Sequence, residues 1–207
     1  MRAGAITGLV LAGGRGSRMG GVDKGLQAFG GATLAARALL RLRPQAQRLA
    51  ISANRHLDRY GALGVPVWPD ADGGFAGPLA GMLAGLAHCT TDWLVTVPCD
   101  APYFPADLVA RLLKAAQHQD ALLAHAAGPG GGSGGDRLRD QPVFALLHAS
   151  LRDDLAAYLA SGGRKVGAWM AAHRPAVARF DAPGDDPTAF ANANTLDELS
   201  AWERHGP

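Results

Sequence analysis

LVLAGGRGSRMGGVDKG, residues 9–25, joins an apolar run to a loop that is rich in glycine and in basic side chains. Glycines directly after an apolar run are typical of a strand that ends in a loop lying close to a ligand. Arg15, Arg18 and Lys24 give this loop a local positive charge, which favours a small anionic ligand. The stretch therefore predicts a buried strand over 6–11 followed by a phosphate-binding loop.

The loop matches neither of the two commonest phosphate-binding fingerprints. The dinucleotide pattern G-x-G-x-x-G can start at Gly14 and Gly16, but Met19 stands where its last glycine belongs. The P-loop requires Gly-Lys-Ser/Thr, whereas here Lys24 follows an aspartate. The loop therefore belongs to a different class of phosphate site.

Composition and charge limit the class of protein. The chain has 207 residues, of which 48% are hydrophobic and 18% charged, as in an ordinary globular protein with a sizeable core. A net charge of +2 argues against a nucleic-acid partner, and no apolar run approaches the ~20 residues that span a bilayer. Cys89 and Cys99 form no C-x-x-C pair, so we expect neither a disulfide framework nor a zinc site, and a cytoplasmic location.

Apolar runs alternate with helical patterns along the first 118 residues. The expected strands cover 6–11, 49–52, 65–68 and 93–97. The expected helices cover 33–42, 77–86 and 105–118. This rhythm indicates βαβ units and an α/β fold with a mostly parallel sheet.

The second half is less regular. Residues 126–140 are glycine-rich and of low complexity, which predicts a flexible loop. Beyond it we expect strands over 142–147 and 177–180, and helices over 150–160 and 166–173. Thr195 and Glu198 form a capping box that opens a last helix.

Polar residues stand where the predicted strands end, and ligands of parallel sheets bind at that edge. They are the glycine loop, Ser52, Asn54, Asp70, Asp72 and Asp100. Asp100 could shape a turn, but beside a basic loop it is also placed to hold Mg²⁺, which binds one or two carboxylates together with phosphate oxygens. The seven histidines are scattered, and nucleotidyl transfer needs no Ser-His-Asp or Cys-His arrangement.

LAGGRGSRMGGVDKG, residues 11–25, resembles the signature L-A-G-G-x-G-x-R-M…D-K of nucleotidyltransferases with a Rossmann-like fold. Within that superfamily the chain is most similar to the molybdenum cofactor guanylyltransferases. Landmarks of that family follow in order over nearly the whole chain: SANRH at 52–56, PD at 69–70, GPLAGM at 77–82, PCDAPY at 98–103, RDQP at 139–142 and NANT at 192–195. The glycine loop alone is shared with sugar and cytidylyl relatives, whereas GVDKG, ANRH and GPLAGM together are much more specific.

The resemblance implies a Rossmann-like, three-layer α/β/α fold with a mostly parallel, mixed central sheet. It implies a single nucleotidyltransferase domain over 1–207, whose N-terminal half binds nucleotide and whose C-terminal half binds the pterin. The implied reaction transfers GMP from GTP to the terminal phosphate of molybdenum-bound molybdopterin and releases pyrophosphate, with Mg²⁺ as cofactor. Molybdenum-insertion proteins and molybdoenzyme chaperones are the further implied partners, and neither nucleic acid nor membrane is one.

The same resemblance assigns roles to single positions. The catalytic residues would be Arg18, Lys24 and Asp100, with Asp100 as the metal ligand. The nucleotide-binding residues would be Leu11, Ala12, Gly13, Gly14, Lys24, Ser52, Asn54, Asp70, Gly77, Pro78, Leu79 and Asp100. The pterin-binding residues would be Arg139, Gln141, Asn192 and Asn194.

Two departures and two alternatives accompany this assignment. The family often has Asn-x-Asn where this chain has Ser52 before Asn54, so either residue could contact the nucleotide, and the glycine-rich insertion at 128–135 is long for the family. One alternative is a cytidylyl- or sugar-nucleotide transferase of the same fold, distinguished by contacts to the base. The other is a non-catalytic carrier of a nucleotide or cofactor, which has little need for a catalytic metal at Asp100.

Overall fold

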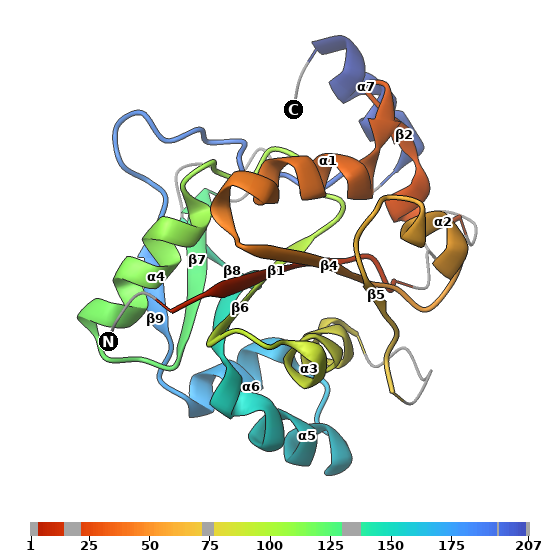
Figure 1. Cartoon of the computed structure of the whole chain (residues 1–207). Coiled ribbons are helices and arrows are strands. Elements are labelled where there is room, and N and C mark those ends of the chain that lie inside the picture. The colour runs from red at the N-terminus through yellow and green to blue at the C-terminus, as the bar shows by residue number, and fades with distance from the viewer. Residues whose placement is uncertain (1–3, 15–21, 72–76, 130–137, 194, 206–207) are drawn as a thin grey trace.

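A seven-stranded sheet forms the centre of the computed structural model, which describes residues 4–14, 22–71, 77–129, 138–193 and 195–205 (Figure 1). The strand order is β5-β4-β1-β6-β8-β7-β9. The strands are β1 (Ile6–Leu11), β4 (Arg48–Ser52), β5 (Val67–Trp68), β6 (Trp93–Pro98), β7 (Leu123–Pro129), β8 (Leu138–His148) and β9 (Ala176–Arg179). β8 runs antiparallel to both its neighbours, and the other pairings are parallel, so the sheet is mixed and mostly parallel.

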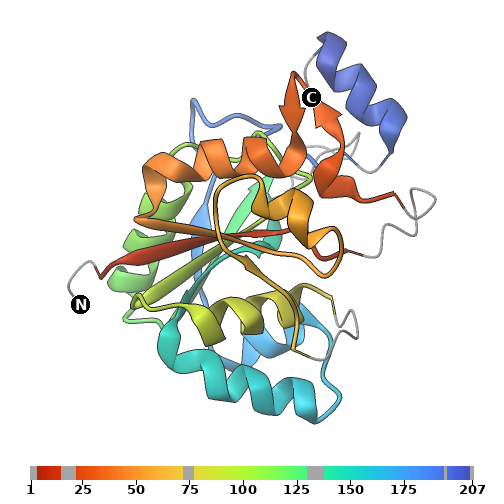
Figure 2. The ribbon, with the colours of Figure 1, turned by 45° about the vertical axis from the view of Figure 1, so that its right-hand side comes forward.

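Helices cover both faces of this sheet and complete the expected three layers (Figures 1 and 2). On one face lie α1 (Leu34–Leu42) and α4 (Leu108–His118), and on the other α3 (Pro78–His88), α5 (Arg152–Ala160) and α6 (Val166–Ala172). Each face has its own buried apolar cluster, centred on residues such as Val10 and Leu112 on the first and Leu9 and Met82 on the second. Successive residues of a strand point to opposite faces, so Leu9 and Val10 of β1 belong to different clusters. The predicted fold class is confirmed.

Smaller elements lie between and beside these strands and helices. They are the hairpin of β2 (Ala28–Phe29) and β3 (Ala32–Thr33), the short helix α2 (Leu57–Gly61), the C-terminal helix α7 (Leu196–His205), and the 3₁₀ turns η2 (Lys24–Leu26), η3 (Arg43–Gln45) and η4 (Ala149–Leu151). Helix α7 lies against the hairpin in both views, and Glu203 Oε1 accepts a hydrogen bond from the Gly30 N–H (Figures 1 and 2). Within the described residues, no helix has the length and apolarity that crossing a membrane requires.

Helix boundaries follow local signals in the sequence. Thr33 is the N-cap of α1, and its Oγ1 accepts a hydrogen bond from the Ala36 N–H. Pro78 stands at the first turn of α3, where a missing N–H has no partner to lose, and Gly77 before it has φ of 77°. The Glu198 N–H donates to Thr195 Oγ1, which confirms the predicted start of the last helix.

The sequence prediction for residues 126–140 is wrong in part. Residues 126–129 do not begin a flexible loop but continue β7, and Leu138–Asp140 begin β8 instead of ending that loop. Close packing requires small residues here. A Cβ on Gly128 would lie 2.5 Å from Phe190, and the side chains of Ala126 and Ala127 are buried. The remainder of the glycine-rich insertion, 130–137, lies outside the described residues.

Candidate active site

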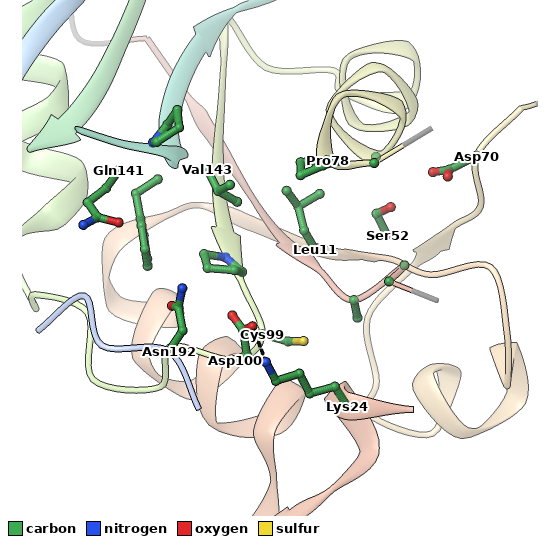
Figure 3. A pocket seen from close by; sticks show the side chains of 18 residues that line it. Leu11, Lys24, Ser52, Asp70, Pro78, Cys99, Asp100, Gln141, Val143 and Asn192 are labelled. Carbon is green, nitrogen blue, oxygen red and sulfur yellow. Dashed lines mark hydrogen bonds and ion pairs between the residues drawn. The ribbon is translucent and has the colours of Figure 1, made fainter. Parts of the chain in front are cut away.

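A cavity of about 370 Å³ opens at the edge of the sheet where β1, β4, β5 and β6 end (Figure 3). Because these four strands are parallel, their carboxyl ends meet at this one edge. The residues that line the cavity are Leu11, Ala12, Gly13, Gly14, Lys24, Ser52, Asp70, Gly77, Pro78, Gly81, Pro98, Cys99, Asp100, Gln141, Pro142, Val143, Phe144 and Asn192. The cavity therefore brings together strand ends that lie far apart in the chain.

The first turn of the glycine loop is held between its two neighbouring strands. The Ala12 N–H donates to the Ser52 carbonyl at 2.8 Å, and the Cys99 N–H donates to the Leu11 carbonyl at 3.1 Å. The sheet ladder thus continues one residue past the end of β1 before the chain turns into the cavity. A Cβ on Gly13 would lie 3.3 Å from Asn54 Nδ2, so this glycine allows the loop to lie close to the segment after β4.

Lys24 and Asp100 form an ion pair at one end of the cavity (Figure 3). Lys24 Nζ lies 2.7 Å from Asp100 Oδ2, and the two side chains are 21% and 22% exposed. Lys24 opens the η2 turn, whereas Asp100 follows β6, so the contact depends on the tertiary structure. A cation and a carboxylate facing one cavity are suited to a phosphate chain and to a metal ion that shares its oxygens.

Asp70 lines the cavity apart from the ion pair (Figure 3), and Asn54 holds it by hydrogen bonds. Asn54 Nδ2 donates to Asp70 Oδ2 at 2.7 Å, and the Asp70 N–H donates to Asn54 Oδ1 at 2.8 Å. Asp70 Oδ1 is buried without a hydrogen-bond partner among the described residues. Burial raises the pKa of Asp70 above its ordinary value of 3.8, and the hydrogen bond from Asn54 opposes that rise.

Ser52 lines the cavity itself, whereas Asn54 does not. A Cβ on Gly81 of α3 would lie 2.7 Å from Ser52 Oγ and 2.8 Å from Leu11 Cδ2. The glycine therefore brings the first turns of α3 close to the end of β4. Of the two residues between which the sequence left the nucleotide contact open, Ser52 is the one that faces the cavity.

The second half of the chain supplies the remaining lining residues. Gln141 and the three residues after it belong to β8, and Asn192 comes from the segment before α7 (Figure 3). The Ala193 N–H donates to the Asp100 carbonyl at 3.1 Å, which ties this segment to the end of β6. The predicted pterin residues Gln141 and Asn192 thus face the same cavity as Lys24.

Other predicted site residues are placed elsewhere. Leu79 is fully buried in the apolar cluster beneath α3, and Arg139 is exposed on β8, so neither lines the cavity. Arg18, Asp72 and Asn194 lie outside the described residues.

Several lining residues were not predicted from the sequence. Pro142 was noticed only as part of a motif, and Val143 and Phe144 read as ordinary strand residues. Cys99 also lines the cavity, but burial raises the pKa of its thiol, as does the charge of Asp100. The thiol therefore stays protonated at neutral pH and is a poor nucleophile.

The donor set fits a metal ion that is shared with a ligand. Among the described residues no group of three or more His, Cys, Asp or Glu side chains is arranged to hold a metal ion. Mg²⁺ does not need such a group, because one carboxylate and phosphate oxygens can hold it. Asp100, facing the cavity beside Lys24, meets that requirement.

Comparison with known proteins agrees with this geometry. Residues 8–177 match the model of the MobA-like NTP transferase domain. A molybdenum cofactor guanylyltransferase of Acidovorax sp. (strain JS42) is 56% identical over 203 residues, which are 97% of this chain and 96% of that protein.

Two solved structures share the fold. Molybdopterin-guanine dinucleotide biosynthesis protein A from Archaeoglobus fulgidus superimposes with a TM-score of 0.72 at 20% identity, over 96% of this chain and 97% of the other. The 2-C-methyl-D-erythritol 4-phosphate cytidylyltransferase from Thermus thermophilus gives 0.69 at 18% identity, over 95% and 96%. With a family model matched over most of its length and a relative more than half identical to it, this chain belongs to the MobA-like NTP transferase family and is a nucleotidyltransferase.

Proposed function

We propose that this enzyme transfers GMP from GTP to the terminal phosphate of molybdenum-bound molybdopterin, with molybdopterin guanine dinucleotide and pyrophosphate as products. The observation that carries the proposal is one cavity lined by both halves of the chain. The glycine loop, Lys24 and Asp100 come from the first half, and Gln141 and Asn192 come from the second. Such a cavity can hold a nucleoside triphosphate and a second substrate face to face. The name of the Acidovorax relative indicates which pair of substrates to test first.

The charges in the cavity account for the chemistry. Backbone N–H groups of the glycine loop and the Lys24 ammonium group bind the triphosphate, with Arg18 as a further expected contact. Nucleotidyltransferases generally use a divalent metal. Asp100 would hold Mg²⁺, which supplies charge neutralisation at the phosphate oxygens and at the departing pyrophosphate.

No general base is needed from this chain. The terminal phosphate of molybdopterin is already ionised, so its oxygen forms the new bond to the α-phosphorus while the bond from that phosphorus to pyrophosphate breaks. The protein contributes position, since holding both groups in line converts a bimolecular step into a unimolecular one. Lys24 stabilises the charge that moves toward the leaving pyrophosphate.

Asp70 and Ser52 are suited to bind the nucleoside. The buried Asp70 Oδ1 has no hydrogen-bond partner among the described residues, and leaving such an acceptor unpaired costs about 1–3 kcal/mol. A donor group of the bound nucleotide would offset that cost. Ser52 Oγ, at the end of β4, adds a group that both donates and accepts.

A division of labour between the two halves of the chain is part of the same proposal. We place nucleotide binding in the N-terminal half and pterin binding in the C-terminal half of one domain over 1–207, with Arg139 and Asn194 as further pterin contacts. Insertion proteins and molybdoenzyme chaperones are the proposed partners for delivery. Both cysteines are free thiols, which is consistent with a cytoplasmic location.

The test is pyrophosphate release from each of the four nucleoside triphosphates, with and without molybdenum-bound molybdopterin. We expect release with GTP, and only when the pterin is present. Thermal stabilisation by each nucleotide with Mg²⁺ is measured alongside. Likeness to a cytidylyltransferase structure at 18% identity shows the fold alone, so the choice of nucleotide has to be measured. Faster release with CTP than with GTP would favour the cytidylyl alternative. Binding without release under any condition would favour the carrier.

A further inference from the structure

A buried hydrogen bond lies behind the cavity and takes no part in the site described above. Tyr60 Oη on α2 donates to Asp23 Oδ1 at 2.6 Å. The Tyr60 side chain is fully buried and Asp23 is 8% exposed. Neither residue lines the cavity. Asp23 is nevertheless the residue directly before Lys24, so the bond fixes the chain next to the cation of the site.

The turn that carries Lys24 is held from several sides. The Asp23 carbonyl accepts from Gln27 Nε2 at 2.9 Å and from the Leu26 N–H at 3.3 Å. On the other side of Lys24, a Cβ on Gly25 would lie 2.4 Å from Tyr60 Oη. The Tyr60 hydroxyl thus contacts both residues that flank Lys24.

The glycine loop closes the same arrangement. A Cβ on Gly25 would also lie 3.2 Å from the Ala12 Cβ. The backbone at Gly25 is therefore confined between Tyr60 and the start of the glycine loop. Only a residue without a side chain fits between them, which explains the glycine in the GVDKG motif.

We infer that the Tyr60–Asp23 hydrogen bond positions Lys24, by fixing the backbone from which its side chain reaches Asp100 and the phosphate chain. The inference rests on the proposed function for the role of Lys24 toward phosphate. Tyr60 is a positioning residue here and touches no substrate.

The physical reason is the flexibility of lysine. Its ammonium group sits on a four-carbon stem, so the accuracy of its placement depends on the backbone that carries it. A hydroxyl buried in the core is a rigid partner for that backbone. Burial raises the pKa of Tyr60, and so does the hydrogen bond to Asp23, so the hydroxyl keeps its proton and remains a donor at neutral pH.

A purely structural role gives a different expectation. Tyr60 and Asp23 could merely satisfy each other as buried polar groups, in which case losing the bond lowers the melting temperature without acting through Lys24. A double-mutant cycle separates the two roles, because residues that act through one another are not additive.

The experiment compares Tyr60→Phe in the wild-type and in the Lys24→Met background. Phe keeps the buried ring and removes only the hydroxyl. We expect kcat/KM to fall about tenfold in the wild-type background. In the Lys24→Met background we expect less than about a twofold change. The matched control is Tyr158→Phe, whose hydroxyl donates to the Lys165 carbonyl and does not line the cavity, and which should leave the kinetics unchanged.

Two substitutions of Asp23 give an independent readout should Tyr60→Phe fold poorly. Asp23→Asn keeps an oxygen that accepts from Tyr60 and should retain most of the activity. Asp23→Ala removes the acceptor and should repeat the loss. Equal losses from Tyr60→Phe in both backgrounds, or equal activity of the two Asp23 variants, would overturn the inference.

The cycle is also kept separate from the choice of substrate. All four nucleoside triphosphates are assayed with the wild type. If the enzyme prefers a nucleotide other than GTP, the GTP proposal is refuted, and the double-mutant cycle is then measured with the preferred nucleotide. In parallel, each variant is titrated with magnesium pyrophosphate, which requires neither guanine nor pterin. Non-additive losses of pyrophosphate affinity support the positioning role, and additive losses refute it.

Discussion

Replacing Lys24 by methionine removes one charge from the cavity and keeps nearly the same length of side chain. In the ligand-free protein Lys24 Nζ bonds to Asp100 Oδ2 at 2.7 Å, with each side chain about one-fifth exposed. Partly exposed ion pairs contribute no more than about 1 kcal/mol to stability. In a chain of this size that corresponds to a fall in melting temperature of roughly 2–4 °C.

The effect on catalysis should be larger than the effect on stability. A hydrogen bond from an ammonium group to phosphate contributes about 1.5–3 kcal/mol. Since each 1.36 kcal/mol changes a rate tenfold, kcat/KM should fall by about ten- to 150-fold. The loss should appear in kcat if Lys24 acts mainly on the departing pyrophosphate, and in KM if it binds substrate and transition state equally.

The assay is steady-state pyrophosphate release with GTP and the pterin substrate, with melting temperature measured on the same samples. Lys114→Met is the matched control, because Lys114 is an exposed lysine on α4 away from the cavity. Normal kinetics in Lys24→Met, with or without a lower melting temperature, would refute the phosphate contact. Lys24 would then be only the partner that neutralises Asp100.

Three further predictions concern other residues of the cavity. Asp100→Asn should lower kcat by about a hundredfold or more, without rescue at high Mg²⁺ and with a melting temperature within a few degrees of wild type; near-normal turnover with the same Mg²⁺ dependence would remove the metal assignment. Burial raises the pKa of Asp70 above its ordinary value of 3.8, so the wild type should lose stability relative to Asp70→Asn as the pH rises from 3.8 to the raised pKa. Parallel melting profiles of the two proteins against pH would contradict this. Gly81→Ala places a Cβ 2.7 Å from Ser52 Oγ, so it should lower the free energy of unfolding by about 1–3 kcal/mol in denaturant and weaken GTP binding. Gly167→Ala, at an open position on α6, should change neither quantity. Tight GTP binding by Gly81→Ala would show that α3 can move.

Local signals were sufficient for much of the N-terminal half of the fold. An apolar run followed by glycines predicts β1 and its loop, and the strand over Ile6–Leu11 agrees with that prediction at both ends. Asp100 stands out because a carboxylate directly follows a buried run. Lys24 stands out because a lysine lies in a glycine-rich loop. In each case the signal lies within a few residues, and parallel strands bring their ends to one edge without further information.

The tertiary structure alone decided which of these residues meet. Lys24 and Asp100 are 76 positions apart, and Tyr60 and Asp23 are 37 apart, so no local pattern links them. The placement of β8 between β6 and β7 is likewise a long-range pairing, and it carries Gln141 into the cavity. The error at 126–129 has the same origin: glycine and alanine read as a loop by composition, but packing against Phe190 selects small residues in a strand. Composition reports what the backbone can adopt, whereas the choice between strand and loop depends on neighbours that only the folded chain supplies.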